Sequence, residues 1–433
     1  MIGLRLLQGL ALGGEYGAAA TYVAEYAQNG RRGLYTAWVQ AAAPFGLFLS
    51  LLVIVVTRSC MDEVAFEAWG WRVPFLGSMA LLVVSIWMRM QLHESPVFEA
   101  LREEGRLSIA PVRDSFGQSG NLKLVLLALF GLTAGQGVVW YTGQFYALFF
   151  LTQTLRVDND TAYGMMAIAL LCVVPFYIFF GALSDRVGRK PIIMVGCLLA
   201  ALTYFPLFQA LTHYANPTLQ EAQNTAPIVV SANAQDCSFL FNPIESVRFT
   251  SSCDEAKSYL SKAGLSYSNQ NLEVNGLASI QIGDRVVRSF DGAASDAKWQ
   301  RLRFQSEIQS ALKQAGYPTK ANPSMINQPM VVIILFILMS YVAMVYGPIA
   351  AMLAEMFPTQ IRYTSMSLPY HVGNGWFGGF LPTVSFAIVA TSGNVYDGLW
   401  YPIGVALMTL TIGVFFVRER RDVDIRRVDC DVM

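Results

Sequence analysis

The sequence predicts an all-α protein that crosses a membrane several times and carries a small α/β domain outside the bilayer. Three observations support this fold class. Of the 433 residues, 54% are hydrophobic and only 14% are charged, whereas a water-soluble domain carries roughly 25% charged residues. Long apolar segments recur along most of the chain. A polar stretch, residues 214–327, interrupts them.

The composition argues against several classes of function. The 30 basic and 30 acidic residues give a net charge of zero, so nothing indicates a nucleic-acid partner. The three His residues and the six Cys residues, with no Cys-x-x-Cys spacing, make a metal site unexpected. No pairing of a nucleophile with a base is visible in the sequence. We therefore expect neither an enzyme nor a bound cofactor.

Nine segments are long and apolar enough to span a bilayer, which requires about 20 such residues per helix. They are approximately residues 1–24, 36–57, 72–91, 122–151, 162–183, 191–212, 328–352, 364–390 and 397–417. Several contain Gly or Pro, which membrane helices tolerate where neighbouring helices satisfy the freed backbone groups.

Basic residues predict how these segments are oriented, because Lys and Arg collect in cytoplasmic loops. They follow every second segment, whereas the connections 58–71, 152–161 and 391–396 are poor in them. The basic connections contain Arg31, Arg32, Arg102, Arg106, Arg113, Arg186, Arg189, Lys190, Arg362, Arg418, Arg420, Arg421, Arg426 and Arg427. We therefore expect a cytoplasmic C-terminus and an inserted domain on the opposite side of the membrane.

An internal repeat relates the first three segments to the last three. Residues 16–25 match residues 346–355 at their Tyr-Gly and Ala-Glu pairs, and Arg32 matches Arg362 at the same offset of 330. A chance resemblance of Gly- and Ala-rich helices would not keep one offset throughout. Three predicted helices separate the two copies, so two equal halves would need three further helices before residue 1. We expect a chain that begins within its first half.

The polar stretch 214–327 is too long for a structureless loop, which predicts a small domain. It contains strand-like runs at 227–231 and 279–284 and helix-like runs at 253–260 and 295–314. Disulfides persist outside the cytoplasm, and we expect one between Cys237 and Cys253. The sequence leaves open whether this domain captures substrate, binds a partner or only stabilises the protein.

Several motifs resemble those of one transporter family. Residues 181–191, Gly-Ala-Leu-Ser-Asp-Arg-Val-Gly-Arg-Lys-Pro, resemble the cytoplasmic loop signature of the major facilitator superfamily. Residues 5–15, with Arg-Leu-Leu-Gln-Gly and then Gly-Gly-Glu, resemble its fourth-helix motif. Residues 31–33, 94–98 and 354–358 are more narrowly similar to the metabolite:proton symporter family, whose members move α-ketoglutarate, citrate, shikimate, proline or betaine with protons.

The resemblance covers the whole chain except about 214–327, and it implies a major facilitator fold. Complete members have twelve helices in two bundles, and residue 1 falls just before the fourth-helix motif. We therefore expect about nine transmembrane helices, with the first three of the fold lacking. The expected parts are the remaining N-terminal bundle (1–91), a cytoplasmic linker (92–121), the C-terminal bundle (122–213 and 328–417), the extracytoplasmic inserted domain (214–327) and a cytoplasmic tail (418–433).

Candidate gating residues lie near the cytoplasmic helix ends. Asp185 is expected to pair with Arg186, Arg189 or Arg362, or with a helix N-terminus. The other acids, Glu25 and Glu355, are expected to pair with Arg32 and Arg362. Such pairs can latch one of the two states that alternating access requires. A merely topogenic basic loop is the alternative for Asp185. The full set is Asp185, Arg186, Arg189, Glu25, Arg32, Glu355 and Arg362.

Polar side chains inside apolar segments are candidates for substrate binding or proton coupling, because charges at membrane depth face a cavity or a partner. In the first segment these are Arg5, Gln8 and Glu15, with Arg5 at the outer membrane surface as the alternative. In the later segments they are Gln136, Tyr141, Gln144, His371 and Asn374, with packing between helices and a structural histidine as the alternatives.

The expected function is proton-coupled symport of a small organic acid or zwitterion by alternating access in the plasma membrane of a bacterium, with the inserted domain in the periplasm. Residues 41–46 occupy the place of the motif that the superfamily links with antiport and lack its leading Gly-Pro, which favours symport. The expected partners are the substrate, protons and the lipid bilayer. The alternatives are a sensor that uses the inserted domain and a non-functional fragment of a transporter.

Overall fold

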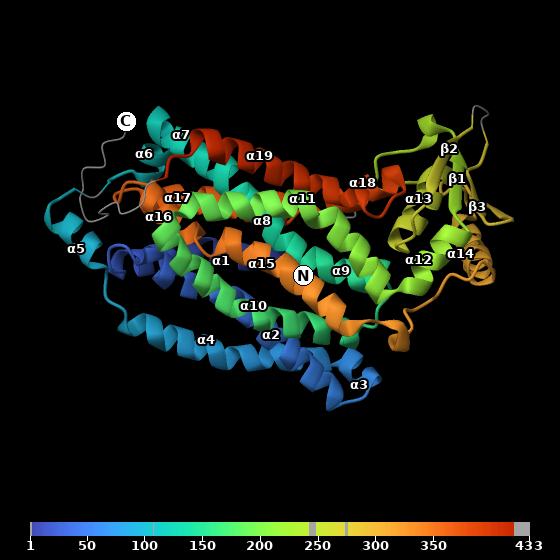
Figure 1. Cartoon of the computed structure of the whole chain (residues 1–433), viewed down its shortest axis with the longest axis horizontal. Helices are drawn as coiled ribbons and strands as arrows, with labels where there is room; N and C mark the ends of the chain where they lie inside the picture. The colour runs from blue at the N-terminus through green and yellow to red at the C-terminus, as the bar shows by residue number, and fades with distance from the viewer. Residues whose placement is uncertain (1, 107, 242–247, 273–275, 420–433) are drawn as a thin grey trace.

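The computed structural model describes residues 2–106, 108–241, 248–272 and 276–419, and only the backbone of residues 2–6 and 10–14. Long helices lie side by side, and a small domain with a β-sheet caps one end of them (Figure 1). The short helices α5 and α6 lie at the opposite end of the molecule. The predicted class, an all-α membrane protein with a small α/β insertion, is confirmed.

The helices follow the predicted segments closely, with η marking short 3₁₀ or π turns. The N-terminal part contains α1 (Ile2–Tyr26), α2 (Arg32–Ser59), α3 (Glu63–Ala68), η1 (Gly70–Arg72), α4 (Val73–Gln91), α5 (Pro96–Glu103) and α6 (Pro111–Gly117). The next three spans contain α7 (Ser119–Ala128), η2 (Leu129–Thr133), α8 (Ala134–Tyr141), η3 (Thr142–Tyr146), α9 (Ala147–Phe149), η4 (Phe150–Thr154), α10 (Asn159–Val187) and α11 (Arg189–Ala215). The last three contain α15 (Gln328–Tyr346), α16 (Ile349–Met356), α17 (Arg362–Val372), η7 (Gly373–Gly378), α18 (Leu381–Ser392), η8 (Asp397–Leu399) and α19 (Trp400–Phe416).

Eight helical runs among the described residues are long and apolar enough to cross a membrane. They coincide with the second to ninth predicted segments. The first predicted segment forms α1 but is not one of these eight runs. The polar residues Arg5, Gln8 and Glu15 interrupt its apolar sequence.

The helical run Ser119–Thr154 is continuous but not uniform. Three π turns, η2, η3 and η4, occur in it, and a fourth π turn, η7, follows α17. Such turns shift the side chains that follow by about one position and frequently occur at functional sites. Two of the predicted site residues, Gln144 and Asn374, lie within these turns.

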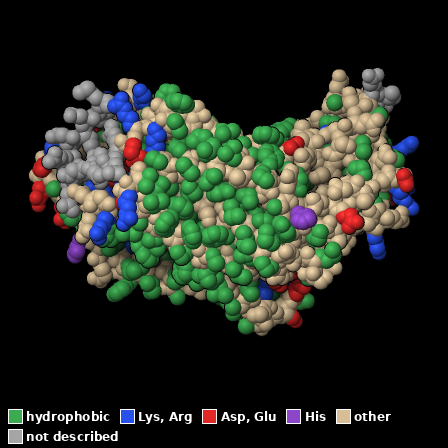
Figure 2. Space-filling model, viewed as in Figure 1, with side chains coloured by type: hydrophobic (Ala, Val, Ile, Leu, Met, Phe, Trp, Pro, Cys, Tyr) green, Lys and Arg blue, Asp and Glu red, His purple; other side chains and the backbone are tan. Residues whose placement is uncertain are grey.

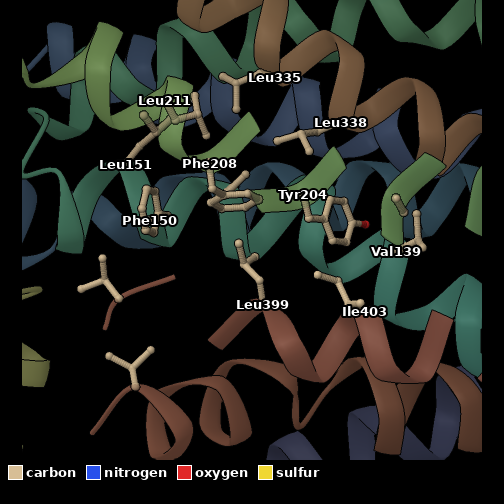
Figure 3. Packing of buried hydrophobic residues seen from close by; sticks show 14 of the residues in the cluster. Val139, Phe150, Leu151, Tyr204, Phe208, Leu211, Leu335, Leu338, Leu399 and Ile403 are labelled. Atoms are coloured by element: carbon tan, nitrogen blue, oxygen red, sulfur yellow. The ribbon is translucent and has the colours of Figure 1, made fainter. Parts of the chain in front are cut away.

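The core of the C-terminal bundle is formed by large apolar side chains from α8, η4, α11, α15 and α19 (Figure 3). Phe208 of α11 packs edge to face against Phe150, with 5.0 Å between ring centroids. Lipid tails are as apolar as these side chains, so close packing rather than exclusion of water holds membrane helices together. The same core includes Val139, Phe150, Leu151, Tyr204, Phe208, Leu211, Leu335, Leu338, Leu399 and Ile403.

The N-terminal helices meet the C-terminal bundle mainly where α2 crosses α10. Glycines face each other there: a Cβ on Gly33 would lie 2.3 Å from the carbonyl oxygen of Gly181. Helix α1 packs beside α2 and against α16 and α17. The helices that carry the two copies of the repeat, α1–α2 and α15–α17, are thus in direct contact.

The inserted domain has a four-stranded sheet in the order β2-β1-β3-β4, with β1 parallel to β2 and the other pairs antiparallel. The predicted strands form β1 (Ile228–Ala232) and β3 (Ser279–Ile282), and the predicted helices form α13 (Ser252–Lys262) and α14 (Ala297–Gln314). Short polar elements escaped prediction: α12 (Pro217–Thr225), η5 (Ala234–Asp236), β2 (Ser268–Asn271), β4 (Arg285–Arg288) and η6 (Pro323–Met325). Cys237 and Cys253 form a disulfide in this domain.

Hydrophobic and basic side chains occupy different parts of the surface along the long helices. A broad band of hydrophobic side chains covers the long helices, with Lys and Arg side chains at the end opposite the inserted domain (Figure 2). Helix α4 contributes no buried residue, so its apolar side chains all lie on the surface. A band of this kind is the surface that a bilayer would cover.

Candidate functional site

Buried charges connect the two copies of the repeat at the end opposite the inserted domain. Arg362 Nη1 lies 2.7 Å from Glu25 Oε1, and Arg32 Nη1 lies 3.5 Å from Glu355 Oε1. Each acid therefore pairs with the arginine of the other copy, across the contact between α1–α2 and α16–α17. Arg189 adds a contact of 3.0 Å to Glu355. Buried charges of this kind must be paired, because an uncompensated one costs about 3–5 kcal/mol.

Asp185 fastens α10 to the start of α2. Its two carboxylate oxygens each accept a hydrogen bond of 2.8 Å from the backbone N–H groups of Gly33 and Leu34. Arg189 Nη2 lies 2.9 Å from the same carboxylate. A carboxylate at a helix N-terminus satisfies unpaired donors and interacts favourably with the helix dipole. Of the partners considered for Asp185, the structure shows a helix N-terminus and Arg189, while Arg186 lies exposed beside them.

A second layer, of aromatic and amide side chains, lies within the helices and follows the same repeat. The Gln40 amide donates to the Tyr16 hydroxyl at 2.7 Å. The residues 330 positions later, Tyr346 and Tyr370, have their hydroxyl oxygens 2.8 Å apart. The two pairs meet where the rings of Tyr16 and Tyr370 stack, with 3.5 Å between centroids. We call these four residues the tyrosine layer.

Polar groups of the neighbouring helices surround the tyrosine layer. Tyr177 of α10 packs edge to face on Tyr346 and accepts a hydrogen bond of 3.2 Å from Gln144. The indole of Trp140 lies 6.3 Å from Tyr346 between centroids. Among the described residues, the buried Nε1 of Trp140 and the Oε1 atoms of Gln40 and Gln144 have no hydrogen-bond partner. Such buried groups are uncommon, and together they offer one donor and two acceptors.

The predicted residues of the later segments occupy this region, but they do not form one cluster. Gln136 and Asn374 bond each other through their amides, at 3.0 and 3.2 Å. Tyr141 packs on the ring of Trp140, with 4.9 Å between centroids. His371 lies beside Tyr370. It lines a cavity of about 450 Å³, and no residue of the tyrosine layer lines the same cavity. Its buried Nε2 has no hydrogen-bond partner in the described part of the chain.

Neither Gln8 nor Glu15, two candidates of the first segment, is brought to the tyrosine layer. The side chain of Arg5 lies outside the described residues, and that of Gln8 is exposed. Glu15 is about half exposed and forms an ion pair with Arg89 of α4. The structure thus places Glu15 between two helices rather than in a relay with the other candidates.

Sequence reasoning did not select four residues at the centre of this region: Tyr16, Gln40, Tyr177 and Tyr346. A signal for three of them was present in the repeat. Tyr16 matches Tyr346 at the offset of 330, and the same offset relates Gln40 to Tyr370. Tyr177 has no counterpart of this kind, and its role follows from packing alone.

Family models of known proteins match the chain on both sides of the inserted domain. The family model described as Major Facilitator Superfamily matches residues 1–218, and the one described as Sugar (and other) transporter matches residues 311–430. Alpha-ketoglutarate permease of Escherichia coli (strain K12) is 36% identical over 215 residues, which cover 49% of this chain and 48% of the relative. No solved structure matches the chain.

Two further relatives come from the same strain. The shikimate transporter is 32% identical over 219 residues, covering 49% of this chain and 48% of its own length. The proline/betaine transporter is 27% identical over 218 residues, covering 47% of this chain and 42% of its own length. The chain spans about half the length of the curated relatives it matches.

Proposed function

The chain belongs to the Major Facilitator Superfamily, and from this premise we propose that it is a secondary transporter that moves a small organic acid or zwitterion together with protons. The relatives are named for such molecules: α-ketoglutarate, shikimate, and proline or betaine. A proton gradient supplies the energy, at about 2.3 kcal/mol for each charge moved across 100 mV.

The observation that carries the proposal is the contact between the two copies of the repeat at two depths. Crossed ion pairs, Glu25–Arg362 and Glu355–Arg32, hold one end of the helices. The stacked rings of Tyr16 and Tyr370 join the copies deeper inside. Alternating access needs halves that rock about a central site, with contacts that form in one state and break in the other. In this proposal, the crossed ion pairs are the contacts that break.

The proposed substrate site is the tyrosine layer with its unpaired neighbours. The free atoms of Trp140, Gln40 and Gln144 can hydrogen-bond a polar substrate, and the surrounding rings can pack against its carbon skeleton. The ring of His371 packs against Tyr370 of this layer, and an imidazole can carry a proton, so it is our first candidate for the coupled proton. The ion-pair acids and Glu15 are the other candidates.

We also propose an orientation. The ion-pair layer, with Arg32, Arg189 and Arg362, faces the cytoplasm of a bacterial cell, and the inserted domain faces the periplasm. Lys and Arg side chains gather at the end of the long helices opposite the inserted domain, although others lie on that domain itself (Figure 2), and basic loops of membrane helices stay in the cytoplasm. Labelling of single cysteines in intact cells tests this: Trp299 of α14, replaced by Cys, should react with an impermeant maleimide.

Uptake of labelled candidates into proteoliposomes tests the function. The full chain should take up at least one of α-ketoglutarate, shikimate, proline or betaine, faster with an inward proton gradient and slowly after an uncoupler. Tyr370→Phe removes a hydroxyl of the tyrosine layer and should reduce uptake about tenfold, the loss expected from about 1.4 kcal/mol. Tyr35→Phe, on the exposed side of α2, is the matched control. Uptake that ignores the gradient would remove symport from the proposal.

A further inference from the structure

A cavity of about 330 Å³ lies between the inserted domain and the ends of the membrane helices. This volume is within the range of small-molecule sites, about 300–1,000 Å³. One wall comes from η3, η4 and α18, and the other from the end of α13. The lining residues include Tyr146, Phe149, Phe150, Gln153, Thr154, Ser261, Lys262 and Phe386. We call this space the vestibule.

The walls of the vestibule are held in place, because hydrogen bonds to backbone carbonyl oxygens join the inserted domain to the helices around it. The Tyr267 N–H donates to Gly393 O at 2.7 Å, and its hydroxyl donates to Ala390 O. On the other side, the guanidinium of Arg156 donates to Pro318 O at 2.6 Å and to Ala263 O at 3.0 Å. These contacts all join the domain to the C-terminal bundle, so the walls keep their spacing.

A glycine also permits a close approach of the inserted domain to η4. Gly264 has φ of +65°, and a Cβ there would lie 2.5 Å from the Cα of Thr154. The end of α13 therefore reaches the backbone of η4, which brings Ser261 and Lys262 to the vestibule. The fit of this glycine shows that the two walls are matched to each other rather than loosely juxtaposed.

The walls combine an apolar surface with a positively charged, hydrogen-bonding edge. Aromatic rings of Phe149, Phe150 and Phe386 form the apolar part. Lys262 supplies a cation, and no Asp or Glu stands among the described lining residues. Ser261 adds a buried hydroxyl beside that of Tyr267, which donates to Ala390 O. A cation beside a hydroxyl suits a carboxylate, and the rings suit a hydrocarbon body.

The vestibule adjoins the proposed transport path. Tyr146 lines it and lies two residues after Gln144 on the same helical run. The Tyr146 ring also packs on Phe208, with 5.6 Å between centroids, in the core of the C-terminal bundle. One wall of the vestibule is therefore part of the helical run that carries Gln144.

We propose that the vestibule is a second binding site, which holds small organic anions with one carboxylate and a ring or hydrocarbon body. The carboxylate lies at Lys262 and Ser261, and the body lies against the three phenylalanines. The site belongs to the inserted domain and the helices jointly. It binds without a proton gradient, so its occupancy is measured separately from transport.

Binding of benzoate to the full chain in lipid nanodiscs, followed by calorimetry, tests the proposal. Benzoate should bind, and benzamide, which has the same shape without the charge, should bind at least tenfold more weakly. Lys262→Gln should weaken benzoate binding about tenfold, whereas Lys298→Gln, at an exposed lysine of α14 outside the vestibule, should leave it unchanged.

A second variant tests the binding site by filling its volume instead of removing its charge. Val389→Phe enlarges a lining side chain and should abolish binding of benzoate by filling the space, while thermal unfolding shows that the variant is folded. Absence of benzoate binding, or binding that neither Lys262→Gln nor Val389→Phe changes, would overturn the proposal. Equal binding of benzamide would overturn it too. Loss of uptake with benzoate binding intact would count against the transport proposal alone.

Discussion

Individual charged residues show how the two copies of the repeat meet at the end opposite the inserted domain. Glu25 and Glu355 were expected to pair with Arg32 and Arg362, and the structure shows which acid takes which arginine. Each pair joins one copy to the other. Pairing within a copy would stabilise each half separately, whereas crossed pairing couples the halves. The side chains of Arg32 and Glu355 are both 1% exposed, so solvent screens their attraction little.

Exchanging the charges of Glu25 and Arg362 tests whether this ion pair stabilises the folded protein. Arg362→Gln leaves Glu25 buried without its arginine and should destabilise the folded protein by about 3–5 kcal/mol. Glu25→Arg combined with Arg362→Glu restores opposite charges and should recover most of that loss. Thermal unfolding in detergent measures both.

Arg31→Gln, at an exposed arginine beside the pair, serves as the control and should change stability by less than about 0.5 kcal/mol. A double variant as unstable as Arg362→Gln would show that the charges of this pair do not couple the halves.

At the scale of the helix, the contact between α2 and α10 depends on small residues. Gly33 and Gly181 let the two backbones approach, and Asp185 then reaches the first N–H groups of α2. The sequence predicted a charge contact for Asp185 of the loop signature. It did not identify α2 as the partner of Asp185, because that choice depends on which helices are adjacent.

Two glycines of the same helix give a matched prediction. Gly33→Ala places a Cβ 2.3 Å from Gly181 O and 2.4 Å from Ser184 Oγ, so α2 and α10 must separate. Uptake into proteoliposomes should fall at least tenfold. Gly46→Ala, with nothing within 4 Å of the added Cβ, should retain uptake and gain up to about 1 kcal/mol from its higher helix propensity. Equal behaviour of the two variants would contradict a close α2–α10 contact as the cause.

At the scale of the whole molecule, the inserted domain is bound to the C-terminal bundle. It begins after α11 and ends before α15, and the Asn327 N–H donates to Tyr214 O at 2.9 Å. The chain therefore enters and leaves the domain at one place. Hydrogen bonds of Tyr267, Asn269 and Arg156 join the domain to segments of the C-terminal bundle.

Removal of the domain separates transport from a sensing role. Replacement of residues 216–325 by a short Gly-Ser link should keep the helices folded, because the two ends of the domain lie together. Uptake should persist at about half or more of the full chain's rate, and benzoate binding in the vestibule should be lost. Folded helices without uptake would instead favour a function that requires the inserted domain.

The fold was largely predictable from the sequence, and the site only in part. Eight runs were visible because apolar residues over about 20 positions allow few structures except a membrane helix. Gln136, Gln144 and Asn374 could be selected as polar residues in such runs, but their partners could not. The short polar strands β2 and β4 carry too little hydrophobic pattern to be seen.

The sequence by itself determined which segments enter the membrane, the repeat between the two sets of helices and the disulfide-linked pair of cysteines. Only the tertiary structure decided that the repeat copies exchange ion-pair partners, that Tyr16 stacks on Tyr370, and that Glu15 turns to Arg89. The physical reason is the distance along the chain over which each property is decided. Burial in a bilayer depends on local composition, whereas a hydrogen bond or ion pair depends on which distant helices lie side by side.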